Sequence, residues 1–175
     1  MGVCHMLIGH PCSGKTTFRH AALEILLCNK IEVLSLDDQL ELRAFVHKTT
    51  YNEAFKTYSR FCELIVTNNA KDAYRDGRDV MWDMTNLTAK SRAKKLRLFP
   101  GYDKIAYVFP RLDVEEIMTR QSSRVGKTVP KKVIEGMLAS YEPPTSGEGF
   151  DQIVYMEAIE AIIDSHKKRN SAGDC

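Results

Sequence analysis

Short apolar runs and helical periods alternate along the chain. Val3–Ile8 is an apolar run that ends at a glycine, which predicts a buried strand, and apolar residues then recur at helical spacing within Thr16–Leu27. Further strands are predicted at Ile31–Leu36, Asp79–Asp83, Tyr102–Phe109 and Gln152–Met156. Further helices are predicted at Tyr51–Ala73, Thr88–Phe99 and Val114–Ser123, after Pro130, and at Ala158–His166. This alternation predicts a three-layer α/β fold around a parallel sheet of about five strands.

The length of 175 residues suits a single domain with a full core. We assign residues 1–167 to this domain and expect residues 168–175 to form a flexible tail. No apolar stretch approaches the ~20 residues of a membrane span, so we expect no membrane association. The cysteines are odd in number and scattered, which favours free thiols in a reducing cytoplasm.

The basic residues are concentrated in two segments, although the net charge is only +2. Thr88–Phe99 and Ile117–Ile134 each carry five lysines and arginines and no acidic residue. Such clustering on a nearly neutral chain indicates a site for an anionic ligand. A solvated helix face is the alternative for the first segment.

A phosphate-binding motif stands between the first strand and the first helix. Gly9–Thr16 fits G-x-x-x-x-G-K-[ST]. In this context the backbone N–H groups and the helix N-terminus bind phosphate, Lys15 reaches the β and γ phosphates, and the Thr16 hydroxyl ligates Mg²⁺. The expected nucleotide-binding residues are Gly9, Cys12, Ser13, Gly14, Lys15, Thr16 and Thr17.

Two common classes of P-loop protein are excluded by what surrounds this motif. A GTPase needs a DxxG motif, which is absent, and an NKxD motif after a later strand. A motor ATPase needs a glutamate after the acid that ends its strand, and Met84 stands there after Asp83. A small phosphotransferase remains, in which a base acts on a substrate hydroxyl.

Acidic and polar residues follow the second and third strands, at the edge where ligands of parallel sheets bind. We expect Asp37 to be the base and Asp38 to be the N-cap of the next helix, although a capping role for either acid is the alternative. Asp83, Thr85 and Asn86 could hold Mg²⁺-bound water or a substrate phosphate, or could cap the helix that begins near Thr88.

The second basic segment predicts a lid at about residues 117–142. Arg120 and Arg124 are four residues apart and share a helix face. The sequence Val125-Gly126-Lys127 then breaks the helix and Pro130 restarts it. A basic helical hairpin of this kind is typical of a lid that closes arginines onto transferring phosphates. A solvated basic turn is the alternative.

Together these motifs resemble the kinase domain of bacteriophage-type polynucleotide kinases, which phosphorylate 5′-hydroxyl ends within the P-loop phosphotransferase superfamily. The resemblance runs from Val3 to about Glu157 and rests on GHPCSGKTT, SLDD, WDMTNL and RQSSRVGKTVPKKVI. It implies that Lys15 and Thr16 hold ATP and Mg²⁺, that Asp37 is the general base and that Arg124 stabilises the transferring phosphoryl group. It also implies that Arg120 lines the nucleotide side and that Thr85, Val129 and Pro130 contact the acceptor.

Two features depart from this family. Leu40 stands where such enzymes often carry an arginine for the acceptor's 3′-phosphate, and Arg43 is the candidate substitute one turn further on. The phosphatase domain of the family, with its DxDGT motif, is absent. The sequence is therefore that of a kinase without attached 3′-end healing, or of an excised domain.

The function expected from the sequence is transfer of the γ-phosphate of ATP or another NTP to the 5′-hydroxyl of RNA or DNA, with Mg²⁺. Such a kinase would work in the cytoplasm, that of the host if it is phage-encoded, alongside a phosphatase and a ligase. A small-molecule kinase for a nucleoside, sugar or antibiotic is one alternative. A non-catalytic nucleotide-binding module is the other.

Overall fold

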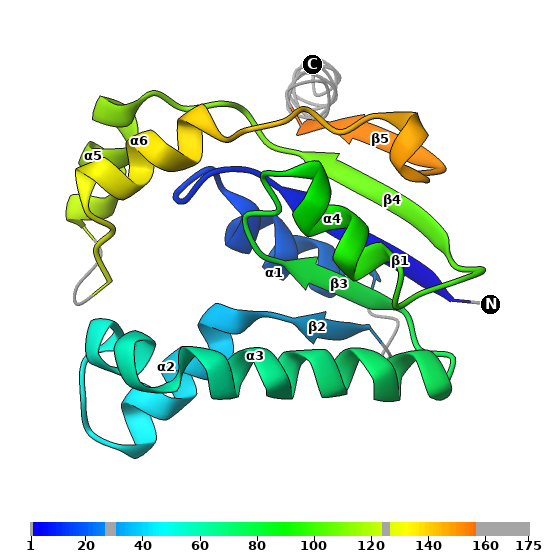
Figure 1. Ribbon diagram of the computed structural model, residues 1–175, viewed down its shortest axis with the longest axis horizontal. Coiled ribbons are helices and arrows are strands. Elements are labelled where there is room, and N and C mark those ends of the chain that lie inside the picture. The colour runs from blue at the N-terminus through cyan, green and yellow to red at the C-terminus, as the bar shows by residue number, and fades with distance from the viewer. Residues whose placement is uncertain (1, 27–30, 124–126, 157–175) are drawn as a thin grey trace, which may run out of the picture.

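The computed structural model describes residues 2–26, 31–123 and 127–156, and its centre is one parallel sheet (Figure 1). The strands are β1 (Val3–Ile8), β2 (Glu32–Leu34), β3 (Val80–Asp83), β4 (Asp103–Val108) and β5 (Gln152–Tyr155). They lie in the order β2-β3-β1-β4-β5, and every pair is parallel. The predicted α/β fold with five parallel strands is confirmed.

The register of the sheet brings the segments that follow three strands to one edge. Leu7 of β1 pairs with Asp83 of β3, and Leu34 of β2 pairs with Trp82. Because all strands are parallel, the segments that follow β1, β2 and β3 leave from the same carboxyl edge. These segments are the phosphate loop, the first turn of the helix after β2, and the turn that contains Thr85.

Helices cover both faces of the sheet. In the described ranges there are six α-helices: α1 (Lys15–Leu26), α2 (Leu36–Val46), α3 (Tyr51–Arg75), α4 (Ala89–Leu96), α5 (Val114–Ser122) and α6 (Lys131–Ala139). A 3₁₀ turn, Ser146–Glu148, precedes β5. One core cluster joins Met6 and Ile8 of β1 to Val66 of α3 and Leu96 of α4. On the opposite face, Phe18 of α1 packs against the cluster that contains Leu7.

The second strand is shorter than predicted, and this changes the position of the two acids after it. β2 ends at Leu34, and Ser35 is the N-cap of α2, because its hydroxyl accepts a hydrogen bond from the Asp38 N–H. Asp37 and Asp38 therefore lie in the first turn of α2. The prediction that Asp38 is the N-cap is wrong, since Ser35, the residue directly after the strand, supplies the cap oxygen.

Three further predictions concern the C-terminal end of the chain, the cysteines and the membrane. The predicted helix Ala158–His166 and the tail 168–175 lie outside the described residues, so the domain assignment 1–167 stays a prediction. Cys4 and Cys62 are buried free thiols. None of the helices in the described ranges has the length and apolar character needed to cross a membrane.

Candidate active site

A cleft of about 980 Å³ lies at the carboxyl edge of the sheet. Its floor comes from the phosphate loop and the end of β3, and its walls come from α2, α3 and α4 on one side and from the α5–α6 hairpin on the other. Floor residues are Pro11–Thr17 and Asp83–Thr85. Wall residues of α2, α3 and α4 are Leu36, Asp37, Tyr51, Asn52, Phe55, Lys56 and Lys95. The hairpin contributes Arg120, Gln121, Ser123, Lys127–Pro130, Val133 and Met137.

The phosphate loop has the backbone that its glycines permit. Gly14 has a φ of +96°, in the left-handed region that favours glycine. A Cβ at Gly9 would lie 2.7 Å from the Ser13 hydroxyl oxygen and 2.8 Å from the Phe109 Cβ, so only glycine fits there. The Lys15 ammonium is buried and donates to the carbonyl oxygens of Gly9 (2.9 Å) and His10 (2.5 Å). The loop therefore holds this cation against its own backbone carbonyls.

Two oxygen donors of the cleft suit a magnesium ion. The Thr16 hydroxyl and the Asp83 carboxylate both line it. Burial raises the pKa of Asp83, and the charges of Arg19 and Lys15 oppose this shift. Mg²⁺ keeps several waters and usually takes only one or two protein oxygens beside phosphate. Thr16 and Asp83 therefore fit a magnesium ion that is bound together with phosphate. The described part of the chain has no cluster of three His, Cys, Asp or Glu side chains that could hold a metal ion without phosphate.

Arg19 connects helix α1 to one acid of α2 and one acid of β3. Its Nη1 lies 2.7 Å from Asp38 Oδ2 and 3.1 Å from Asp83 Oδ2, and the arginine is almost completely buried. Arg19 thus links α1, α2 and β3. Asp38 points to this arginine, while its neighbour Asp37 lines the cleft.

Asp37 is contacted from two directions. The Tyr51 hydroxyl of α3 donates to its Oδ1 at 2.6 Å, and the Lys127 ammonium lies 2.8 Å from its Oδ2. Lys127 also pairs with Glu41 at 2.8 Å and lies 4.6 Å from the centroid of the Tyr51 ring. A residue of the hairpin therefore reaches across the cleft to α2 and α3.

The described part of the predicted lid is a helical hairpin whose two arms are bonded together. The Gln121 amide donates to the Val129 carbonyl (3.0 Å) and accepts from the Val129 N–H (2.9 Å), which places Val129 and Pro130 on the cleft wall. Arg120 donates to the carbonyl of Cys12 in the phosphate loop at 3.1 Å. Arg124 lies outside the described residues.

The structure does not bring two of the predicted substrate residues to the cleft. The Asn86 side chain is buried, with Nδ2 donating to the Leu7 carbonyl (2.7 Å) and Oδ1 accepting from the Lys95 ammonium (2.5 Å). The Arg43 guanidinium stacks 4.7 Å from the centroid of the Phe61 ring, between α2 and α3. Neither residue lines the cleft, and Leu40 is buried in the core.

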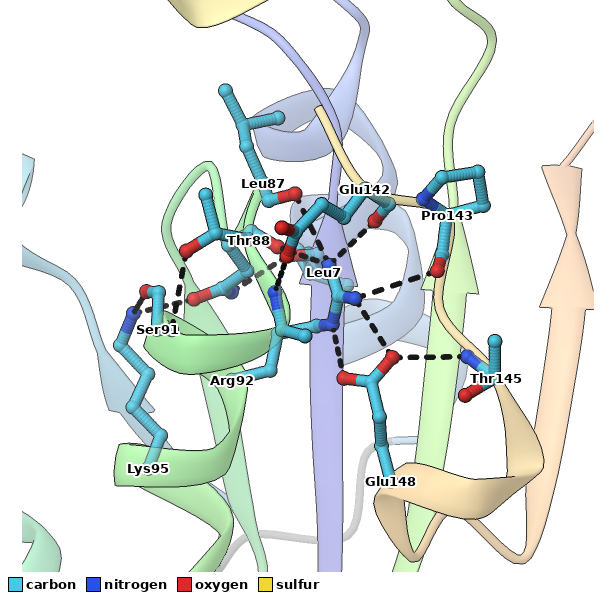
Figure 2. A network of polar contacts seen from close by, with 12 residues as sticks. Leu7, Leu87, Thr88, Ser91, Arg92, Lys95, Glu142, Pro143, Thr145 and Glu148 are labelled. Carbon is cyan, nitrogen blue, oxygen red and sulfur yellow. Dashed lines mark hydrogen bonds and ion pairs between the residues drawn. The ribbon is translucent and has the colours of Figure 1, made fainter. Parts of the chain in front are cut away.

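The five basic residues of Thr88–Phe99 lie in three different environments. Arg92 is wholly buried, and Figure 2 shows its guanidinium bonded to Glu148 and to the carbonyls of Leu87, Glu142 and Pro143. It is thus part of the interior, which the acid-free pattern around it did not indicate. Lys95 lines the cleft, and the exposed remainder comprises Lys90, Lys94 and Arg97.

Sequence reasoning missed four residues of the site. Lys127 and Lys95 stand within the two basic segments, but nothing in the pattern separates them from their neighbours. Arg19 lies one helical turn after Lys15, a spacing that could have placed it beneath the phosphate loop. Tyr51 carries no signal that could have been read from the sequence.

Comparison with known proteins places the chain in a family. A family model described as "AAA domain" matches residues 4–144. Transcription factor bHLH140 of Arabidopsis thaliana is 25% identical over 185 residues, which is 96% of this chain but only 17% of that protein. A candidate kinase from Chloroflexus aurantiacus has the same fold, at a TM-score of 0.66, 16% identity and coverage of 96% of this chain and 97% of that one.

Solved structures with this fold include a chain of an RNA repair complex and a gluconokinase. A chain of the Pnkp1/Rnl/Hen1 RNA repair complex matches at a TM-score of 0.60 and 22% identity, over 79% of this chain and 43% of its own. A gluconokinase from Sinorhizobium meliloti matches at 0.52 and 17%, over 88% and 81%. The chain therefore belongs to the AAA domain family, and its fold is that of P-loop kinases.

Proposed function

We propose that the protein is an ATP-dependent kinase that phosphorylates the 5′-hydroxyl end of RNA or DNA. The observation that carries this proposal is the joint lining of one cleft by the phosphate loop and by the Asp37 carboxylate. A donor phosphate on the loop and an acceptor hydroxyl at Asp37 would then share one cavity. Positioning of this kind supplies most of the catalysis in phosphoryl transfer.

The donor side of the cleft is formed by the loop and the hairpin. The loop N–H groups and Lys15 bind the β and γ phosphates, and the Lys15 ammonium exchanges its present carbonyl partners for phosphate oxygens. Thr16 and Asp83 would hold Mg²⁺, whose charge neutralises the phosphate oxygens when it is bound. Arg120, next to Cys12, lies on the nucleotide side. Arg124 stays the proposed arginine for the transferring phosphoryl group.

On the acceptor side, Asp37 acts as the base. An acceptor hydroxyl takes the place of Lys127 or Tyr51 at the carboxylate and loses its proton to it. The hydroxyl oxygen forms a bond to the γ-phosphorus while the bond from that phosphorus to the β–γ bridging oxygen breaks, so ADP leaves. The proton then passes from Asp37 to water.

A polynucleotide acceptor is favoured by the character of the wall near Asp37. Tyr51, Phe55, Val129 and Pro130 give it aromatic and apolar side chains, on which a base can stack. Structures of an RNA repair complex and of a fungal RNA kinase (TM-score 0.51, 15% identity, 88% of this chain and 73% of that one) share the fold. A product with a 5′-phosphate end suits a ligase, and we propose a separate phosphatase and ligase as functional partners.

A small-molecule kinase is the second candidate, because the gluconokinase shares the fold. One assay separates the two: γ-labelled ATP is incubated with the protein and RNA or DNA oligonucleotides that end in a 5′-hydroxyl. Matched oligonucleotides with a 5′-phosphate, free nucleosides and gluconate serve as the comparison acceptors. We expect strong label on the oligonucleotides that end in a 5′-hydroxyl, weaker label on free nucleosides, and none on the 5′-phosphate oligonucleotides or gluconate. Label on free nucleosides without label on the oligonucleotides would support a nucleoside kinase. Label on gluconate alone would support the small-molecule kinase.

A further inference from the structure

Lys95 presents a cation to the cleft without an acidic partner. Its ammonium donates to the Asn86 side-chain oxygen (2.5 Å) and to the Ser91 hydroxyl (3.1 Å), and Figure 2 shows it beside Ser91 at the edge of α4. Both partners are uncharged, and no carboxylate of the described ranges forms an ion pair with it. An ammonium has three donor hydrogens, so one is left for another acceptor.

The fold holds this cation in place rather than leaving it to solvent. Asn86 has a φ of +50°, a left-handed conformation that asparagine tolerates better than most residues. Its Nδ2 bond to the Leu7 carbonyl fixes the amide, so its oxygen faces Lys95. The centroid of the Trp82 ring lies 5.7 Å from the ammonium. Burial lowers the pKa of Lys95 to about 8, with Lys94 adding to this shift and Glu63 opposing it.

A partly buried cation without a counter-charge is costly, and in a cleft it indicates an anionic ligand. The donor side of the cleft already has Lys15 and Arg120 for the nucleotide phosphates. Lys95 instead lies next to the turn that contains Thr85, because its partner is Asn86. The family that the sequence resembles often has an arginine for the acceptor anion at the position of Leu40, and Arg43 was the candidate substitute. Neither residue lines the cleft.

We propose that Lys95 binds an anionic group of the acceptor, next to the hydroxyl that receives the phosphate. In a polynucleotide this group is the phosphate that follows the first nucleoside. Asn86 and Ser91 are the positioning residues for the ammonium. This inference rests on the proposed function for the identity of the acceptor, but the cation itself is a property of the cleft.

The test is a binding measurement that needs no turnover. Calorimetry gives the Kd of a nucleoside 3′-monophosphate and of the same nucleoside without phosphate, for the full chain and for Lys95→Met. Lys94→Met is the matched control, since it removes an exposed neighbouring charge on α4 that does not line the cleft. Thermal unfolding of each variant checks that it folds.

We expect the unmodified chain to bind the 3′-monophosphate at least tenfold more tightly than the nucleoside. Lys95→Met should remove this preference, Lys95→Arg should keep most of it, and Lys94→Met should leave it unchanged. A Lys95→Met variant that keeps the preference, or an unmodified chain that has none, would overturn the proposal. Equal weakening of both ligands by Lys95→Met would show a merely structural role and would also overturn it.

The pH dependence in the unmodified chain is a second readout if Lys95→Met fails to fold. The preference for the phosphate should decline as the pH rises through about 8, where Lys95 loses its proton. Its persistence to pH 9.5 would contradict the proposal. Failure of the proposed function is distinguishable, because it appears in the label-transfer assay. If that assay identifies an acidic sugar, the same variants are compared on it and its neutral analogue, with the same expected loss.

Discussion

The Nζ atom of Lys127 lies 2.8 Å from Oδ2 of Asp37, so the hairpin between α5 and α6 contacts the first turn of α2 across the cleft. The lysine side chain is only 15% exposed, whereas that of Asp37 is 51% exposed. Tyr51 donates to the other carboxylate oxygen. The proposed base therefore has a partner on each oxygen, and an acceptor hydroxyl has to replace one of them.

Without Lys127, an acceptor hydroxyl no longer has to displace an ion pair from Asp37. We therefore expect Lys127→Met to bind an uncharged acceptor more tightly. Because the Asp37 carboxylate is half exposed, we take the contribution of this pair as that of a surface ion pair, about 0.2–1 kcal/mol, so the KM of a phosphate-free nucleoside should fall by roughly 1.4- to 5-fold. Steady-state kinetics at saturating ATP measure it. Lys131→Met is the control, because Lys131 pairs at 3.7 Å with Glu115 and does not line the cleft. A KM that rises in Lys127→Met would show instead that this lysine binds the acceptor.

The two neighbouring acids of α2 should differ sharply in their effect on turnover. Asp37→Asn should lower kcat by about 10²–10⁴, which is the usual contribution of a general base, with little change in ATP affinity. Asp38→Asn alters the charge of the same helical turn but only weakens a contact with Arg19, so it should lower kcat much less. Single-turnover rates at saturating ATP compare the two variants. A larger loss of kcat in Asp38→Asn than in Asp37→Asn would show that Asp38, and not Asp37, is the base.

The sheet, its helices and the phosphate loop could be predicted because each has a local signal. Val3–Ile8 is apolar, its neighbour Gly9 opens the motif, and the helical period follows directly. The role of Arg92 could not be predicted, since its partner Glu148 is 56 residues away and only the fold brings them together. Asn86 was predicted to bind substrate but does not line the cleft, whereas Lys95, which the pattern did not distinguish, lines it. Their contact depends on a left-handed backbone at Asn86 that the sequence does not specify.

The Arg92–Glu148 pair should contribute substantially to stability. The guanidinium is wholly buried and the carboxylate nearly so, with contacts of 2.7 and 2.8 Å. Because Glu148→Gln leaves the buried charge of Arg92 without its counter-charge, we expect a loss of about 3 kcal/mol in the free energy of unfolding at pH 7. Urea denaturation measures it, and Glu115→Gln, in an exposed pair, should change stability by at most about 1 kcal/mol.

The same pair predicts that the free energy of unfolding depends on pH. Burial raises the pKa of Glu148, but the hydrogen bonds from Arg92 and the Thr145 N–H, with the charge of Arg92, outweigh burial and leave the pKa below its ordinary value of 4.5. The stabilisation is therefore fully present above that value and is lost as the pH falls through the lowered pKa. The difference in unfolding free energy between the unmodified chain and Glu148→Gln should narrow below about pH 4.5. A constant difference down to pH 3 would contradict this assignment.

The most direct test of the account is the site of phosphate transfer and its dependence on Asp37. A 5′-hydroxyl oligonucleotide is incubated with γ-labelled ATP and either the unmodified protein or Asp37→Asn, and nuclease digestion locates the label. The account predicts label on the 5′-terminal oxygen alone, formed at least 100-fold more slowly by the variant. Label at any other position, no label with the unmodified protein, or equal rates for the two proteins would contradict it.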